Sequence, residues 1–228
     1  MHFRLIFICL ALVAAVTAQT ENSANRVSLQ PCEVPGAEEG KKEKVLCGTY
    51  EVFENRDLKA GRKIPLKIVV FPAKSSVKEP DPLFYIPGGP GSSATEDAPY
   101  VAQDFEKIRE HRDLVFVDQR GTGGSNPLSC EFFDPKDVQS YLGHWDPPAQ
   151  VRECRKQLEQ KADLKLYGTS IAMDDLDEVR NALGYGKINL YGGSYGTRAT
   201  MAYVRQHGAN ARSILLHGVS PFDQFMAD

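Results

Sequence analysis

The sequence Ile188-Asn189-Leu190-Tyr191-Gly192-Gly193-Ser194-Tyr195-Gly196 joins an apolar run to a predicted helix that begins at Tyr195. The apolar run is typical of a strand buried on both faces of a parallel sheet. A nucleophilic serine needs a sharp strand-to-helix turn, and glycines on both sides let that turn approach neighbouring backbone without a clash. In this context the G-x-S-x-G pattern predicts Ser194 as a nucleophile. The alternative is an ordinary glycine-rich turn.

A second glycine cluster, Pro87-Gly88-Gly89-Pro90-Gly91-Ser92-Ser93, follows the apolar run Leu83–Ile86. Where a serine stands on such a turn, one oxyanion-hole donor is the N–H of the next residue, here Tyr195, and the other comes from the loop after an earlier strand. Glycines leave their N–H groups uncovered, so we predict Gly89 as the second donor, with Gly88 as the next choice. A phosphate-binding loop would require a lysine that this segment lacks, which leaves a plain turn as the other interpretation.

A third cluster, Asp118-Gln119-Arg120-Gly121-Thr122-Gly123-Gly124-Ser125, follows the apolar run Leu114–Val117. It superficially resembles a dinucleotide-binding fingerprint, but its glycines do not complete G-x-G-x-x-G, and Asn126-Pro127 interrupts the position where a helix should begin. We therefore predict a shaped loop at the carboxyl edge of the sheet. Asp118 and Arg120 are expected to hold this loop by hydrogen bonds rather than to contact substrate.

Apolar runs and helical patterns alternate along most of the chain. Strands are predicted at Tyr50–Phe53, Ile64–Phe71, Leu83–Ile86, Leu114–Val117, Ile188–Tyr191 and Ile214–Leu216. Helices are predicted at Pro99–Glu110, Val151–Ala162, Ile171–Leu183 and Tyr195–His207. A turn between the first two strands makes them an antiparallel pair. The alternation predicts an α/β fold with a doubly wound, mostly parallel sheet.

The predicted helix Ile171–Leu183 carries four acidic residues: Asp174, Asp175, Asp177 and Glu178. Such a cluster could be considered as a metal site. A solvated helix face is the simpler interpretation, because Met173, Leu176, Val179 and Leu183 already form the apolar stripe that a core-facing helix needs.

Four sequence blocks occur in a fixed order and together resemble a known family. They are Gly88-Gly89-Pro90-Gly91, then Asp118 to Ser125, then Asp175-Leu176-Asp177 with Leu183-Gly184-Tyr185, and last Gly192 to Arg198. From about Cys47 to Pro221 the chain resembles α/β-hydrolases of the prolyl-aminopeptidase-like serine peptidase family, and among them it is most similar to secreted tripeptidyl aminopeptidases. One departure is Pro87, where many relatives have His, but the second oxyanion donor is a backbone group.

The resemblance implies a serine exopeptidase that releases residues or tripeptides from peptide N-termini through an acyl-enzyme on Ser194, with Gly89 and Tyr195 as the oxyanion hole. Its partner would be a peptide with a free N-terminus, and no cofactor or metal is implied. Two alternatives remain: a non-catalytic binding protein with an α/β-hydrolase-like fold, and a carboxylesterase.

The chain offers no evident base for Ser194. The order on this fold is Ser, then Asp or Glu, then His, but only His207, His217, Asp223 and Asp228 follow the nucleophile. His207 lies about 20 Å along the following helix, and His217 ends a strand rather than standing on a later loop. We therefore expect that the triad Asp and His are not present in this chain. The C-terminal strands and the lid would be missing as well, so the chain is expected to be an N-terminal half, inactive alone.

The first 18 residues predict a secretory signal peptide. A basic start is followed by the apolar run Leu5–Val16 and by small residues up to Ala18. A membrane anchor is the alternative, but this run is shorter than the roughly 20 residues that span a bilayer. We expect cleavage after Ala18, an N-terminal arm at 19–46, and a partial α/β-hydrolase domain at 47–228. The protein would then be secreted or periplasmic, without stable membrane insertion.

Composition narrows the class of protein. The chain has 228 residues, 42% of them hydrophobic, and a net charge of −3, which argues against a nucleic-acid partner.

Removal of the first 18 residues leaves four cysteines, an even number that suggests disulfides in an exported chain. Of the three possible pairings, the local one, Cys32 with Cys47 and Cys130 with Cys154, is predicted. Free thiols are the alternative, and a zinc site lacks suitable spacing.

Overall fold

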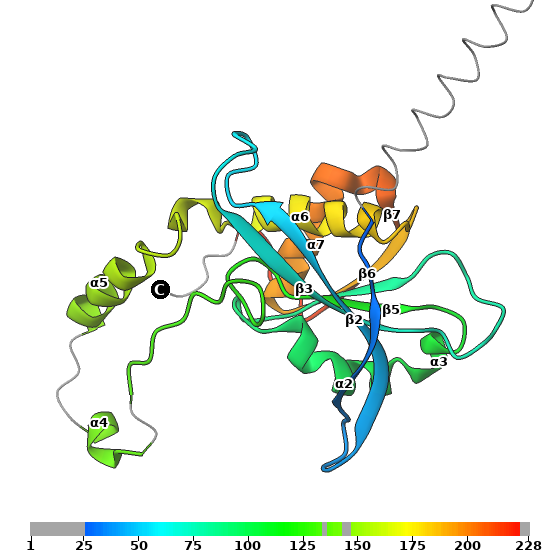
Figure 1. Cartoon of the computed structure of the whole chain (residues 1–228), viewed down its shortest axis with the longest axis horizontal. Helices are drawn as coiled ribbons and strands as arrows, with labels where there is room; N and C mark the ends of the chain where they lie inside the picture. Colours follow the sequence, from blue (N-terminus) through cyan, green and yellow to red (C-terminus); the bar gives the residue numbers. More distant parts are fainter. Residues whose placement is uncertain (1–25, 134–135, 143–146, 224–228) are drawn as a thin grey trace, which may run out of the picture.

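The structure, a computed structural model, describes residues 26–133, 136–142 and 147–223 and contains a seven-stranded sheet in the order β1-β2-β3-β5-β4-β6-β7 (Figure 1). The strands are β1 Gln30–Pro35, β2 Lys42–Phe53, β3 Lys63–Phe71, β4 Leu83–Ile86, β5 Leu114–Val117, β6 Ile188–Gly193 and β7 Ala211–His217. The neighbours β1 to β3 and β3 to β5 are antiparallel, whereas β5, β4, β6 and β7 run parallel. The α/β fold with an antiparallel start and a parallel remainder is therefore confirmed.

The antiparallel part of the sheet begins earlier in the chain than the sequence patterns indicate. The segment 19–46, expected to be an arm, contributes β1 and the first residues of β2 to the sheet. Exposed and buried residues intermix along these strands, so they lack the continuous apolar run by which the central strands are recognised. Cys32 and Cys47 link β1 to β2, with their Cα atoms 5.9 Å apart.

Six helices lie within the described residues: α2 Ala94–Asp104, α3 Glu106–Arg109, α4 Val138–Leu142, α5 Pro147–Leu158, α6 Thr169–Ala182 and α7 Tyr195–His207. Short 3₁₀ turns occur at η1 Leu164–Leu166 and η2 Gly208–Asn210. The helix predicted to start at Pro99 begins five residues earlier, because Ser93 caps it: the Ser93 side chain accepts the N–H of Glu96. Pro99 lies inside α2.

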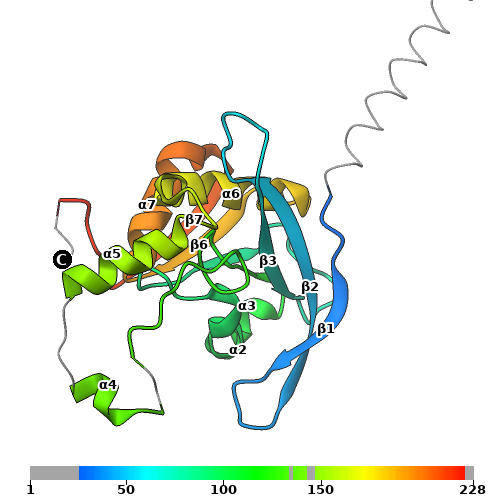
Figure 2. The same ribbon diagram turned by 60° about the vertical axis from the view of Figure 1, so that its left-hand side comes forward.

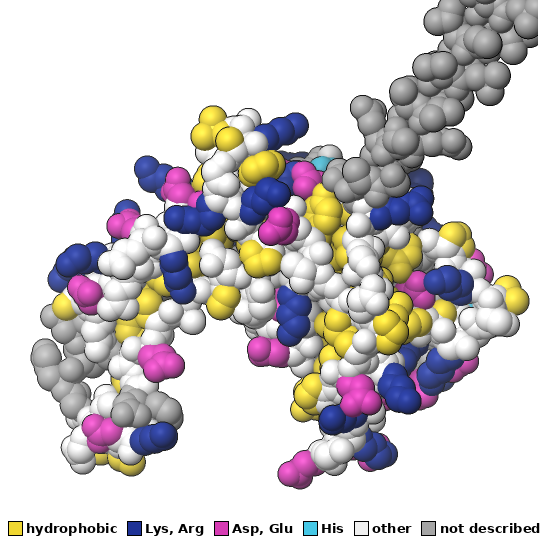
Figure 3. Space-filling view, viewed as in Figure 1, with side chains coloured by type: hydrophobic (Ala, Val, Ile, Leu, Met, Phe, Trp, Pro, Cys, Tyr) yellow, Lys and Arg dark blue, Asp and Glu magenta, His cyan; other side chains and the backbone are white. Residues whose placement is uncertain are grey.

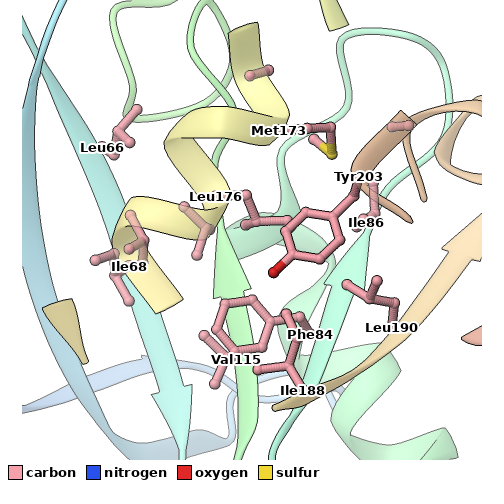
Figure 4. Close-up of a cluster of buried hydrophobic side chains, with 14 of the residues drawn as sticks. Leu66, Ile68, Phe84, Ile86, Val115, Met173, Leu176, Ile188, Leu190 and Tyr203 are labelled. Atoms are coloured by element: carbon pink, nitrogen blue, oxygen red, sulfur yellow. The ribbon is translucent and has the colours of Figure 1, made fainter. Parts of the chain in front are cut away.

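Helices cover both faces of the sheet (Figure 1). On one face α6 and α7 pack Met173, Leu176 and Tyr203 against Phe84, and these side chains are almost fully buried (Figure 4). On the other face the alanines of α2 lie against residues such as Phe71 and Phe116. Each large apolar side chain buried in this way stabilises the fold by about 1.5–3 kcal/mol. The two layers hold the carboxyl ends of β4, β5 and β6 in fixed relation to one another.

The segment that bears α4 and α5 lies at one side of the sheet (Figures 1 and 2). Cys130 and Cys154 are joined, with Cα atoms 5.8 Å apart, so both predicted disulfide pairings are present. Figure 3 shows the molecule deeply notched beside this segment, with acidic and basic side chains interspersed over the visible face.

The described helices include none that is long and apolar enough to cross a bilayer. The predicted signal peptide, residues 1–18, lies outside the described residues.

Candidate active site

Ser194 stands at the turn between β6 and α7, as the sequence predicts. Its backbone has φ 53° and ψ −120°, and the residue is exposed. A positive φ is uncommon for a residue with a side chain and clusters at functional sites. The Ser194 N–H donates to the carbonyl oxygen of His217 at 2.9 Å, and its own carbonyl accepts the Thr197 N–H at 2.9 Å. The turn is thus held in this conformation from both sides.

Close packing requires both glycines of the G-x-S-x-G pattern, Gly192 and Gly196. A Cβ at Gly196 would collide with the carbonyl oxygen of Ile86 and would lie 2.8 Å from that of Pro87. A Cβ at Gly192 would collide with Thr200 Oγ1. The start of α7 therefore approaches the end of β4 more closely than any other residue type permits.

The glycine-proline loop after β4 lies beside Ser194. A Cβ at Gly88 would lie 3.4 Å from Ser194 Cβ and 3.9 Å from its Oγ. Gly89 has φ +104°, and a Cβ there would lie 2.9 Å from the Gly91 nitrogen, so the loop folds back on itself at this position. Gly88, Gly89 and the N-terminus of α7 are thus brought together around one serine, while the assignment of oxyanion donors stays a prediction.

Asp118 and Arg120 hold the loop after β5 by hydrogen bonds, as predicted. The fully buried Asp118 carboxylate accepts bonds from Ser93 Oγ at 2.8 Å, from the N–H and Oγ1 of Thr95, both at 2.9 Å, and from the Gly124 N–H at 2.8 Å. Four donors satisfy a buried carboxylate and remove most of the cost of its burial. The β5 loop is thereby attached to the N-terminus of α2.

Arg120 forms a buried ion pair with Asp175 of α6. Its Nε lies 2.6 Å from Asp175 Oδ2 and its Nη2 lies 2.9 Å from Oδ1, while Nη1 donates to the carbonyl oxygens of Glu54 and Leu166. The expectation that the acids of this helix form a solvated face is therefore wrong for Asp175, which is 2% exposed. Its partner is 55 residues away in sequence, and no local pattern signals that pairing.

A cavity of about 240 Å³ lies between the loops after β4 and β5. Its lining includes Gly88, Gln119, Thr122, Leu128, Tyr167 and Tyr195. The Tyr195 hydroxyl is 2.5 Å from Thr169 Oγ1, and the Tyr167 hydroxyl donates to Glu54 Oε1 at 3.0 Å. Burial raises the pKa of Tyr167 to about 12, so its phenol is neutral at ordinary pH. Leu128 and Tyr167 belong to no sequence motif, so neither is predicted from the sequence as a site residue.

The described histidines do not form a hydrogen bond with Ser194 Oγ. His207 Nε2 lies 2.8 Å from Asp174 Oδ1 at the far end of α7, and the His111 ring lies 3.3 Å from the Val77 carbonyl oxygen. His217 is near the turn through its backbone, while its Nδ1 lies 3.3 Å from the Tyr191 hydroxyl. Among the described residues, no group of three His, Cys, Asp or Glu side chains could hold a metal ion.

A profile of the α/β-hydrolase fold family matches residues 81–226, which include the Ser194 turn and both glycine loops. The chain belongs to the α/β-hydrolase fold family. The matched segment begins just before β4, so it omits the antiparallel strands β1 to β3 and includes every parallel strand.

Several named proteins are similar in sequence to this α/β hydrolase. The serine protease Hip1 of Mycobacterium tuberculosis is 32% identical over 187 residues, which cover 76% of this chain and 35% of that protein. The tripeptidyl aminopeptidase of Streptomyces lividans is 33% identical over 134 residues, covering 53% and 25% respectively. The proline iminopeptidase of Neisseria gonorrhoeae is 27% identical over 139 residues, covering 60% and 32%. The matched part of the chain thus spans a quarter to about a third of these relatives.

Similarity to solved structures occurs at lower identity. The proline iminopeptidase of Mycobacterium smegmatis is 17% identical, with a TM-score of 0.47, and the match covers 73% of this chain and 42% of that one.

Proposed function

We propose that this α/β hydrolase is a serine peptidase that acts on peptide N-termini through an acyl-enzyme on Ser194. The observation that carries the proposal is the Ser194 turn itself: an exposed serine at φ 53°, at the N-terminus of α7, beside Gly88. Peptidases among the named relatives support peptides as the substrate class. Release of tripeptides and the need for a free N-terminus are parts of the same proposal.

In the proposed reaction, Ser194 Oγ attacks the carbonyl carbon of the scissile bond while a base takes the hydroxyl proton. The carbonyl oxygen becomes an oxyanion that accepts hydrogen bonds from the Tyr195 N–H and from the N–H of Gly89. The base then gives its proton to the leaving amine, and water hydrolyses the acyl-enzyme. The positive end of α7 lies where this negative charge develops. No described residue is assigned as the base.

We also propose that the protein is exported. The proposal is supported by two disulfides and by the pattern of residues 1–18. Disulfides persist in oxidising compartments and are rare in the cytosol.

A labelling experiment on the full reading frame that encodes this chain tests the function. A fluorophosphonate probe and a tripeptidyl amide with a chromogenic leaving group would be offered to the wild type, to Ser194→Ala, and to Ser170→Ala as a control at an exposed serine of α6. Labelling and amide hydrolysis should disappear only in Ser194→Ala. Ester hydrolysis without amide hydrolysis would indicate a carboxylesterase, and no labelling of any of the three proteins would indicate a binding protein. Equal labelling of all three would contradict Ser194 as the nucleophile.

A further inference from the structure

The cavity of about 240 Å³ lies beside Ser194, between the glycine-proline loop and the N-terminus of α7. It is lined by Gly88, where an added Cβ would lie 3.4 Å from the Ser194 Cβ, and by Tyr195, whose N–H follows the proposed nucleophile in the chain. Its volume of about 240 Å³ is below the range of 300–1,000 Å³ common for pockets that hold a whole drug-sized ligand. It is therefore suited to one side chain rather than to an entire substrate.

The cavity offers no free charge. Among the described residues that line it, only Arg120, Tyr167 and Tyr195 carry ionisable side chains. The Arg120 side chain is fully buried, and its guanidinium is bound by the Asp175 carboxylate, so its charge is neutralised away from the cavity. A charged ligand side chain that entered would lose its water without gaining a partner, which is costly.

Gln119 supplies the cavity with a neutral polar group. The Gln119 backbone carbonyl accepts the Thr122 N–H, but within the described part of the chain the Gln119 carboxamide forms no hydrogen bond. An amide can donate and accept, so it can pair with a neutral polar group or lie beside an apolar one. Leu128 and Tyr167 provide apolar surface in the same cavity.

The backbone groups beside the cavity indicate which part of a substrate it can hold. The proposed oxyanion donors are the N–H groups of Tyr195 and Gly89. Tyr195 lines the cavity, and so does Gly88, the neighbour of Gly89 in the same loop. The residue whose carbonyl oxygen these donors bind is therefore placed next to the cavity, which is the nearest space for the side chain on the acyl side.

We propose that this cavity binds the side chain of the residue whose carbonyl Ser194 attacks, and that it selects uncharged side chains. This inference rests on the proposed serine peptidase function. Gln119, together with Leu128 and Tyr167, is then a specificity-determining residue rather than part of the reacting group.

A substrate series on the full reading frame tests the proposal. Tripeptidyl amides Ala-Ala-X with one fluorogenic leaving group would carry Ala, Leu, Gln, Lys or Glu at X. Lys and Glu substrates should show kcat/KM lower than the Leu and Gln substrates by roughly tenfold or more, because their charge would be desolvated without a partner. Equal kcat/KM for charged and uncharged residues would overturn the proposal.

Substitutions that introduce a charge at Gln119 give the more specific test. Gln119→Glu should raise kcat/KM for the Lys substrate relative to the Leu substrate, and Gln119→Lys should do the same for the Glu substrate. Gln103→Glu, the same change on the exposed side of α2, should leave these ratios unaltered. Ratios that do not change in the Gln119 variants would contradict the proposal. If the phosphonate does not label Ser194 in the wild type, that result would instead contradict the peptidase function on which the proposal rests.

Discussion

Ser194 donates its backbone N–H to the carbonyl oxygen of His217, with N and O 2.9 Å apart. The bond joins the Ser194 turn after β6 to the end of β7, the next strand of the sheet. The following residues reinforce it: the Ser220 N–H donates to Thr197 Oγ1 at 2.9 Å, and Arg198 Nη2 donates to the Pro221 carbonyl oxygen at 2.6 Å. The strained backbone of the turn is therefore supported by the segment after β7, not only by its own glycines.

The first prediction concerns the contact between the turn and β4. Gly196→Ala should lower the free energy of unfolding by about 1–3 kcal/mol, because its methyl group has no space against the Ile86 carbonyl. The melting temperature should fall by several degrees. Gly193→Ala is the matched control, since a Cβ there would meet nothing within 4 Å. Thermal unfolding of both variants decides the matter, and equal melting temperatures would contradict the packing described.

The buried ion pair leads to a second prediction. Asp175→Asn should lower the free energy of unfolding by about 3–5 kcal/mol, because it leaves the Arg120 charge buried without a counter-charge. Glu178→Gln, the same chemical change on the same helix, removes a half-exposed pair with Arg56 and should cost about 1 kcal/mol or less. Urea unfolding measures both. A cost for Asp175→Asn as small as that for Glu178→Gln would show that Arg120 has other sufficient partners.

These examples indicate what local sequence can and cannot predict. The Ser194 turn, the central strands and the bounds of α7 follow from short patterns, since a buried parallel strand and a strand-to-helix turn each have a strong local signature. The predicted start at Pro99 is five residues late, because the capping residue Ser93 lies inside the glycine-proline cluster, which is typical of a loop. The burial of Asp175 and the cavity at Tyr167 depend on partners far away in the sequence, for which no spacing rule exists.

A third prediction concerns acid stability. Burial alone would raise the pKa of Asp177, but hydrogen bonds from Arg180, Tyr203 and Asn210 outweigh it and lower the pKa to about 2. Because the folded-state pKa lies below the ordinary value of 3.8, the stabilisation is complete above that value and is lost as the pH falls through about 2. The loss should be about 2 kcal/mol.

Chemical unfolding between pH 5 and pH 2 measures this effect as the difference between the wild type and Asp177→Asn. The variant lacks the titrating group, so its stability should fall less steeply over this range. Parallel pH profiles would mean that Asp177 does not contribute.

The disulfides support a fourth prediction. Peptide mapping without reduction should find Cys32 linked to Cys47 and Cys130 linked to Cys154, and any cross-pair would contradict the structure. Replacing both Cys130 and Cys154 by Ser should make the segment between them the first site of tryptic cleavage, because α4, within it, has no buried residues. Replacing Cys32 and Cys47 should instead lower global stability by about 3 kcal/mol.

Export can be tested at the N-terminus. Mature protein should begin at Gln19, because small residues precede this position after the apolar run Leu5–Val16. N-terminal sequencing of secreted material checks the cleavage site. Retention of Met1 in a membrane fraction would indicate an uncleaved anchor.

The contact between Gly196 and the Ile86 carbonyl also bears on how such a protein can diverge. A methyl group at Gly196 has no space unless the end of β4 retreats, so the start of α7 and the end of β4 can change only in concert during evolution. Gln119, Leu128 and Tyr167 line the cavity through their own positions in the chain and are not part of this contact. We therefore expect that lineages adopting new substrates would vary first at these positions, while the turn and the glycine-proline loop are inherited as a unit.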